Sequence, residues 1–559
     1  MSKVPKAQLV VLESWSDSSL AKLPHDDLLS LKSYLISNKY QHFVEDDNQI
    51  FLLDSVFPQI FNSLKNSEGL SDYRVIACDC LSIWILRSNQ IISNKSASSA
   101  IEYNYLLSNL LDEETLTFLY QYVIDFWSDA GSSLSNALKD MFSKLLILIN
   151  NLNFNNKENF KNNLIKNWLI NIFNNLSYTT RVYYFMVENL SKNLLDEPDF
   201  VLNYNKNFLT NSIKIMYSST LANISSKAIQ TVLKNLYSSR YEKTSKDLEW
   251  LNIWCNTVIE NLYDDNLKKN ISIYLLPYLF KISKTSTIKF ISIIKENVNN
   301  NSNKIGNEDE KDISLLLECL KIAQELAIIV EPFDIDQNIE PIISIKDLKL
   351  LLINENPFFR ISSLSLLTFS PKNSKIIKPY IFNIIYEFLP ILFIENDIEI
   401  RNILFSILKN FIIRIRDSSY SINRELINLN KKLNKKNLND NELLLIDNLK
   451  ISLIDYQKFL IKLIDLVHLN LLPGLSYQKI SFALKLLNCI IKSGLDNRIN
   501  KKHLEKNHID YPFNIEIYNK DLFRLLLDNI SDEFNDIRQT STEILNMSPV
   551  SISEIFKEI

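Results

Sequence analysis

The segment ENDIEIRNILFSILKNFIIRIRDSS, residues 395–419, is the stretch that decides the fold class. Acidic and amide residues lead into Arg401, and apolar residues then recur at three- and four-residue spacing, as at Ile403, Leu404 and Ile407. That spacing places the apolar side chains on one face of a helix. The segment therefore predicts an amphipathic helix that begins just before Arg401.

Three further segments share this pattern, in which an acidic or amide residue precedes an arginine and an amphipathic helix. They are SDYRVIACDCLSIWI from Ser71, NPFFRISSLSLLTFS from Asn356 and NDIRQTSTEILNMS from Asn535. In HEAT repeats, Asp or Asn caps the second helix and an arginine reaches an adjacent repeat. We therefore predict that four arginines stand near the starts of the second helices of their repeats: Arg74, Arg360, Arg401 and Arg538.

The spacing of these arginines suits stacked repeats. Arg360 and Arg401 are 41 residues apart, within the period of about 40–47 residues expected of HEAT and armadillo repeats. Arg401 and Arg538 are 137 residues apart, which corresponds to about three repeats of ~46 residues. The predicted fold is an all-α, HEAT/armadillo-like helical-repeat solenoid.

The composition supports a helical array. Only 5 glycines and 14 prolines occur among 559 residues, whereas a β-sandwich or an α/β enzyme of this length needs many more for its turns and phosphate loops. Hydrophobic residues make up 46% of the chain, which is enough to bury a core and excludes wholesale disorder. The formal net charge of -4 indicates no global attraction to nucleic acid or to an anionic membrane.

Chemical motifs are missing from the sequence. It contains no P-loop, dinucleotide-binding glycine fingerprint, nucleophile elbow, HExxH or paired CxxC. Cys78 and Cys80 are two residues apart, so on a helix their thiols diverge, and we interpret them as core residues. Scattered cysteines and the lack of a long uninterrupted apolar segment predict a cytoplasmic protein without a membrane span. We expect no catalytic residue, cofactor or metal site.

Two polar stretches interrupt the helical pattern, and they set the expected organisation. We predict N-terminal helical repeats over residues 1–298, a polar loop over 299–311 and central repeats over 312–427. A polar, basic insertion over 428–441 and C-terminal repeats over 442–559 then follow.

A basic stretch between residues 409 and 436 could neutralise RNA phosphates. The alternative is a solvated loop whose lysines keep an insertion soluble. The candidate RNA or partner contacts in and beside this stretch are Arg414, Arg416, Arg424, Lys431, Lys432, Lys435 and Lys436.

Two blocks of sequence resemble the THADA family of large helical-repeat proteins. In the first, residues 366–419, Ser370-Pro371-Lys372 precedes Glu387-Phe388-Leu389-Pro390, Ile400-Arg401 and the run Arg414 to Ser418. In the second, Pro473, Gly474 and Tyr477 lead into a long helix. The similarity covers most of the chain from about residue 70 and corresponds to the N-terminal part of family members, which are much longer.

The resemblance implies a function for the chain. Fungal members of the family are regulatory partners of a tRNA 2′-O-ribose methyltransferase, so we expect a non-catalytic subunit that assists methylation at position 32 of the anticodon loop. Its partners would be that methyltransferase and tRNA. A scaffold or transport adaptor for other protein partners is the alternative.

Overall fold

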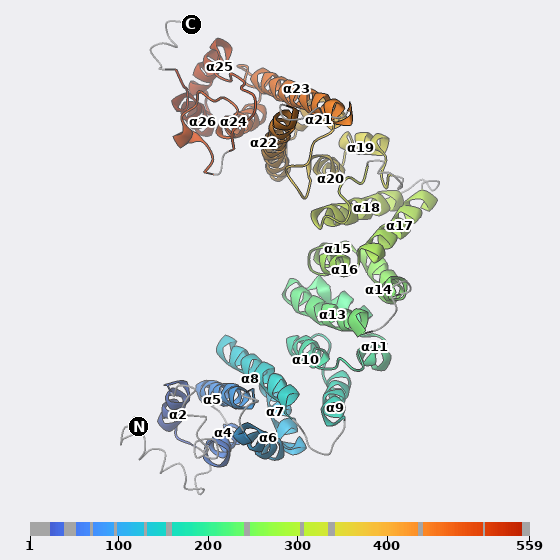
Figure 1. Cartoon of the computed structure of the whole chain (residues 1–559), viewed down its shortest axis with the longest axis vertical. Coiled ribbons are helices and arrows are strands. Elements are labelled where there is room, and N and C mark those ends of the chain that lie inside the picture. The colour runs from blue at the N-terminus through green and yellow to red at the C-terminus, as the bar shows by residue number, and fades with distance from the viewer. Residues whose placement is uncertain are drawn as a thin grey trace. The chain divides into compact units, whose positions relative to one another are not determined.

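The computed structural model describes residues 23–37, 52–67, 71–93, 98–127, 131–152, 159–239, 246–301, 307–333, 341–433, 440–506 and 509–550. Over these ranges the chain is built from helices joined by turns and loops, with no strand. The chain forms two compact units, Met1–Leu275 and Leu276–Ile559. Figure 1 shows the helices in chain order. The all-α, helical-repeat prediction is confirmed.

Unit 1 is a stack of helices of mixed length. Its described elements are α2 (His25–Ser37), the π-helical turn η2 (Leu52–Val56), α4 (Phe57–Lys65), α5 (Ser71–Ile92), α6 (Ser98–Leu110), α7 (Glu113–Trp127), α8 (Ser132–Asn151), α9 (Phe160–Asn175), α10 (Arg181–Ser191), α11 (Phe200–Tyr204), α12 (Phe208–Lys214), the 3-10 turn η3 (Ile215–Tyr217), α13 (Ser219–Ser239), α14 (Lys246–Leu262), α15 (Asp265–Asn270) and the π-helical turn η4 (Ile271–Leu275). One layer runs through α5, α8, α10 and α13, each packed on the next, and α4, α7, α9 and α12 pack against it.

Helix α5 is the one described helix that is long and apolar enough to cross a membrane by length and composition. Of that apolar window 56% is buried inside unit 1, where α5 packs against α2, α4 and α8. The core helix of a folded domain meets the same criterion, so the helix is weak evidence for a membrane span.

Unit 2 has two regular layers. Its described elements are α16 (Leu276–Ile282), α17 (Lys284–Asn301), α18 (Asn307–Glu325), α19 (Ile345–Leu352), α20 (Pro357–Thr368), α21 (Pro379–Leu392), α22 (Ile398–Leu433), α23 (Asp440–Leu469), α24 (Tyr477–Lys492), the 3-10 turn η5 (Lys501–His503), α25 (Lys520–Ile530) and α26 (Asn535–Asn546). We call α17, α19, α21, α23 and α25 the A helices and α18, α20, α22, α24 and α26 the B helices. Each B helix packs on the next, and the two kinds alternate along the chain (Figure 1).

Helix α25 shows how the sequence produces such an element. The side chain of Asn519 accepts a hydrogen bond from the backbone N–H of Leu522 at 2.9 Å and so caps the helix. Leu522, Phe523 and Leu526 lie on one face and are buried, whereas Arg524 is exposed on the other. Each such burial contributes about 1.5–3 kcal/mol relative to an exposed side chain. The amphipathic pattern therefore fixes which face enters the core.

Three expectations about organisation were wrong. Helix α17 extends to Asn301 and α18 begins at Asn307, so the polar loop predicted over 299–311 is mostly helical. Helix α22 likewise continues to Leu433, and α23 begins at Asp440, so both ends of the insertion predicted over 428–441 are helical. Neither stretch carries a proline, and buried Leu426 and Leu429 keep α22 in its helical period.

The third error concerns the 137 residues between Arg401 and Arg538. They span two helix pairs, not three, because α22 has 36 residues and α23 has 30. The two units also divide at Leu275, within a run of consecutive helical elements and away from the polar stretches.

All five cysteines are buried and none forms a disulfide, as expected of core residues. Burial raises the pKa of Cys255 and Cys489 to about 11, so both stay protonated at neutral pH.

Candidate functional site

The four motif arginines occupy the same position in their helices. Arg74, Arg360, Arg401 and Arg538 are each the fourth residue of α5, α20, α22 and α26 respectively. At that position a long side chain can turn back along the helix, toward the residues that precede it. Each guanidinium can therefore reach the backbone of the turn before its own helix.

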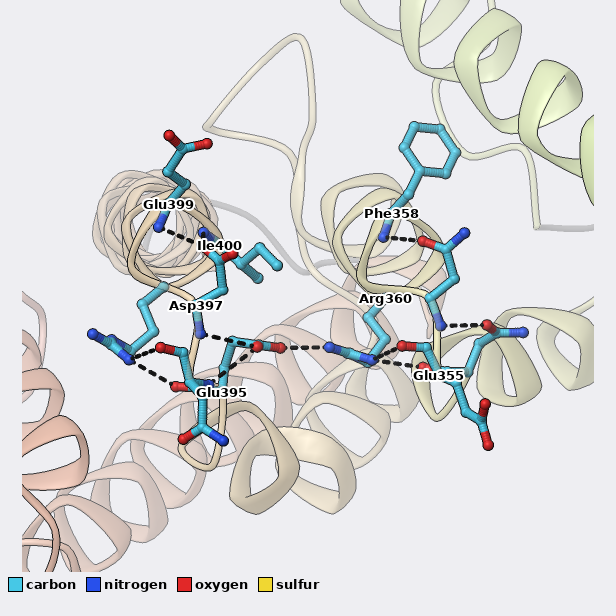
Figure 2. Close-up of polar contacts among 11 residues, drawn as sticks. Glu355, Phe358, Arg360, Glu395, Asp397, Glu399 and Ile400 are labelled. Carbon is cyan, nitrogen blue, oxygen red and sulfur yellow. Dashed lines mark hydrogen bonds and ion pairs between the residues drawn. The ribbon is translucent and has the colours of Figure 1, made fainter. Parts of the chain in front are cut away.

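Figure 2 shows this arrangement at Arg360, and Arg401 has the same one. The Nη1 group of Arg401 donates hydrogen bonds to the carbonyl oxygens of Glu395 at 3.0 Å and Asn396 at 2.7 Å. These carbonyls lie six and five residues before the arginine. Arg360 makes the same pair of bonds at 2.7 Å each, and Arg538 makes them at 2.8 and 2.9 Å. The pattern therefore closes the turn between an A helix and its B helix.

Glu395 joins two of these turns. Its carboxylate pairs with Nη2 of Arg360 (Figure 2). The same carboxylate accepts the backbone N–H of Asn396 at 3.1 Å. The Arg360 and Glu395 side chains are 15% and 14% exposed, so their pairing is largely shielded from solvent. Arg360 thus contacts the neighbouring repeat, whereas the bonds of Arg401 and Arg538 stay within their own turns.

Arg74 occupies the corresponding place in unit 1. Its Nε donates to the carbonyl of Ser67 at 3.0 Å, and its guanidinium lies 3.9 Å from the ring centroid of Phe126. The cation–π contact with α7 holds the start of α5 against the neighbouring helix.

Arg414, a candidate RNA contact, is instead a core residue. It is 2% exposed, and its Nη1 donates to the carbonyls of Thr368 at 2.7 Å and Phe369 at 3.2 Å. Its Nη2 lies 4.0 Å from the carboxylate of Glu331, which is also buried. Burial lowers the pKa of Arg414, and the Glu331 charge opposes that shift. This guanidinium fixes the end of α20 to the segment that follows α18.

Arg416 is also buried, at 5% exposure. Its Nε bonds Asp417 at 3.1 Å, and its Nη1 pairs with Glu505 at 3.4 Å, in the segment after α24. Neither Arg414 nor Arg416 can meet RNA phosphates, so their prediction as contacts was wrong. The error arose because the middle of the long helix α22 is enclosed by loops from both sides.

The other candidate contacts lie further along α22 or beyond it. Arg424, Lys431 and Lys432 are exposed on the C-terminal part of the helix. Lys435 and Lys436 lie outside the described residues.

The loops that follow the B helices form the edge of unit 2 at which those helices end. We call it the loop edge. Its described residues are 326–333, 341–344, 369–378, 493–506 and 509–519. Tyr456 OH accepts the backbone N–H of Ile377 at 2.7 Å and the hydroxyl of Ser418 at 3.1 Å. Side chains from α22 and α23 therefore hold the loop that contains the Ser370-Pro371-Lys372 motif.

Asp496 organises the longest of these loops. It is fully buried and accepts hydrogen bonds from Arg498 Nη2 at 2.8 Å and from the backbone N–H of Ile517 at 3.0 Å. Burial alone would raise the pKa of Asp496, but these hydrogen bonds outweigh burial and hold the pKa below its ordinary value. Sequence reasoning missed Asp496, Glu331 and Tyr456, because each has a partner more than twenty positions away in the chain: Ile517, Arg414 and Ile377 respectively.

The Pro-Gly-x-x-Tyr stretch forms the turn between α23 and α24. Gly474 has a φ of 85°, a conformation that suits glycine. Tyr477 then begins α24, and its hydroxyl donates to Asp536 of α26 at 2.6 Å. The motif therefore links two successive B helices. Within the described residues, no group of three or more His, Cys, Asp or Glu side chains is placed to hold a metal ion.

Residues 250–539, just over half of the chain, match the family model described as "Trm732, TPR repeats". The chain belongs to this family. It is 25% identical over 546 residues to the tRNA (32-2′-O)-methyltransferase regulator trm732 of Schizosaccharomyces pombe, which covers 95% of this chain and 34% of the relative. It is 22% identical over 363 residues to the tRNA (32-2′-O)-methyltransferase regulator THADA of Chlorocebus aethiops, covering 62% of this chain and 18% of the relative. The resemblance to the THADA family is thereby confirmed.

The chain spans about a third of the length of the fission yeast relative and less of the other. Among known structures, a chain from a homology model of the full-length AP-3 complex superposes with a TM-score of 0.35 at 14% identity, covering 98% of this chain and 93% of that one. Importin 13 superposes with a TM-score of 0.31 at 10% identity, covering 96% and 71%. At such TM-scores individual residues do not correspond.

Proposed function

We propose that this chain is a non-catalytic regulatory subunit that assists a separate methyltransferase in 2′-O-ribose methylation of tRNA at position 32 of the anticodon loop. The observation that carries the proposal is the 25% identity to a regulator of that reaction over 95% of the chain. The family match over residues 250–539 supports it, because that range holds most of the regular repeats of unit 2.

In this proposal the methyltransferase supplies the catalytic residues and S-adenosylmethionine, and the chain acts in the cytoplasm. The chain contributes surfaces, as repeat proteins do, because stacked helix pairs present side chains over a long distance. Of the candidate contacts among the described residues, Arg424, Lys431 and Lys432 are exposed, and we propose that they meet tRNA phosphates.

The competing function is a general scaffold for unrelated protein partners. A scaffold would have the same fold, so the two functions are distinguished by the effect of gene deletion on tRNA. We expect deletion to remove the 2′-O-methyl group at position 32 while other tRNA modifications remain. Mass spectrometry of purified tRNA measures both, and expression of the 559-residue chain from a plasmid should restore the methyl group. Full retention of the methyl group in the deletion strain would refute the proposal.

A further inference from the structure

The turns from A helices to B helices lie along one edge of unit 2, which we call the turn edge. Its residues are 353–360, 394–401, 470–480 and 531–538. Side-chain contacts join turns of this edge: Glu395 pairs with Arg360, and the Tyr477 ring packs on the Phe534 ring at an interplanar angle of 46°, with ring centroids 4.4 Å apart. Because the B helices stack in order, these turns form a continuous row.

Every turn in this row exposes a large apolar side chain. The exposed fractions are 53% for Ile353, 59% for Ile394, 66% for Ile398, 45% for Leu472 and 47% for Phe534. Single exposed apolar residues are common on protein surfaces, but a row of them in successive repeats marks an interaction surface.

The charges that accompany this row are mainly negative. Glu355, Asp397, Glu399, Glu533 and Asp536 are exposed. The arginines of the row, such as Arg401, direct their guanidinium groups to turn carbonyls, as Figure 2 shows for Arg360. Within the four turns, which the structure describes completely, Lys479 is the one lysine, and it is half-buried. This edge would repel RNA phosphates and attract a basic surface.

The spacing of the row indicates the shape of what it binds. Helices packed side by side lie about 8–10 Å apart, so the apolar side chains of successive turns recur at that interval. Residues seven apart on an α-helix are separated by about 10.5 Å along its axis. An amphipathic helix lying across the turns could therefore place one apolar residue against each turn.

We propose that the turn edge is the docking surface for the methyltransferase, and that it receives a helix of that enzyme with apolar residues on one face and Lys or Arg beside them. This inference rests on the proposed function, which supplies the partner. Apolar contacts between turn and helix provide the affinity, and the carboxylates of the turn edge speed association with the basic flanks.

The test compares two triple variants of the full 559-residue chain. One replaces Ile353→Ser, Ile394→Ser and Ile398→Ser on the turn edge. The matched control replaces equally exposed residues of α23, Leu444→Ser, Ile451→Ser and Ile454→Ser, which are 62%, 54% and 49% exposed. Calorimetric titration with the purified methyltransferase from the same organism should show that the turn-edge variant binds about 10- to 100-fold more weakly than the unchanged chain. The control should bind as the unchanged chain does.

A charge variant tests the second part of the proposal. Glu355→Lys, Glu399→Lys and Glu533→Lys should slow association about 10-fold at low salt and reduce its salt dependence. Thermal unfolding should be alike for all variants, because every substituted side chain is exposed.

The outcomes separate the inference from the function on which it rests. Turn-edge variants that keep full affinity, or an α23 control that loses as much, overturn the docking surface but leave the regulatory function intact. A parallel loss of tRNA affinity in the turn-edge variants overturns it as well, because RNA would then be the ligand of this edge. If the unchanged chain does not bind the enzyme, the proposed function fails and the inference fails with it.

Discussion

The turn edge and the loop edge of unit 2 use arginine in opposite ways. On the turn edge, Arg401 bonds carbonyls five and six residues earlier in the chain. On the loop edge, Arg414 bonds carbonyls 46 and 45 residues earlier and approaches Glu331 of another repeat. The local arrangement leaves the surrounding apolar and acidic side chains exposed, whereas the long-range one buries the Arg414 guanidinium and the Glu331 carboxylate. The turn edge thus presents exposed side chains to a partner, and the loop edge joins distant segments of unit 2 through a buried side chain.

The largest effect should come from Arg414. We expect Arg414→Met to destabilise the protein by roughly 2–5 kcal/mol, because the carbonyls of Thr368 and Phe369 would lose their buried donor, at a cost of about 1–3 kcal/mol each. The buried Glu331 carboxylate would keep Lys375, at 3.0 Å, as its remaining counter-charge. Urea unfolding of the chain, followed by circular dichroism, measures the change in the free energy of unfolding.

Arg424→Ala is the matched control, because Arg424 lies on the same helix but is exposed. Its free energy of unfolding should stay within about 0.5 kcal/mol of the unchanged chain. If both variants lost the same free energy of unfolding, burial would not explain the contribution of Arg414 to stability.

The same contrast explains what the sequence could predict. A turn-edge arginine belongs to a short sequence motif, such as Glu395 to Arg401 or Asp532 to Arg538. In this motif an acidic or amide residue at the start, an apolar residue and the arginine keep fixed positions. The arginine's bonds to backbone carbonyls span at most six residues, so the motif can be recognised from the sequence alone. Helical period and the scarcity of glycine were enough for the fold class.

The loop edge could not be predicted in this way. Arg414 and Arg416 sit in a basic stretch, and their charge suggested RNA contact. Their burial depends on loops that arrive from residues 331, 368 and 505. The periodicity of the sequence predicts helices but does not indicate which loop packs over which helix. The same applies to the length of α22, whose polar C-terminal part resembles a loop in composition but keeps buried leucines at helical spacing.

An intermediate effect should follow from Arg401→Ala. The substitution removes two hydrogen bonds from one turn, but water can reach the freed carbonyls because the side chain is half-buried. We expect a loss of about 1–3 kcal/mol, measured by urea unfolding, and less than for Arg414→Met. Lys409→Ala, an exposed position on the same helix, should change the free energy of unfolding little. An unchanged unfolding midpoint for Arg401→Ala would show that the hydrogen bonds of Arg401 do not stabilise the protein.

The smallest effect concerns the exposed end of α22. Lys431→Glu with Lys432→Glu should leave the fold intact and weaken tRNA binding modestly, because each phosphate contact releases condensed counterions. If both lysines meet phosphates, the magnitude of the slope of log K against log salt should fall by roughly 1–2 units. The two residues are adjacent on a helix, so their side chains diverge by about 100° and the lower value is expected.

Fluorescence anisotropy of labelled tRNA at several salt concentrations measures this slope. Lys284→Glu with Lys289→Glu, both exposed on α17, makes the same change of net charge elsewhere in unit 2. A local contact predicts that only the α22 variant changes the slope, whereas an effect of net charge alone would change both equally. If neither variant alters affinity or slope, the lysines of α22 only keep its end solvated, and tRNA must be met by another surface or by the methyltransferase itself.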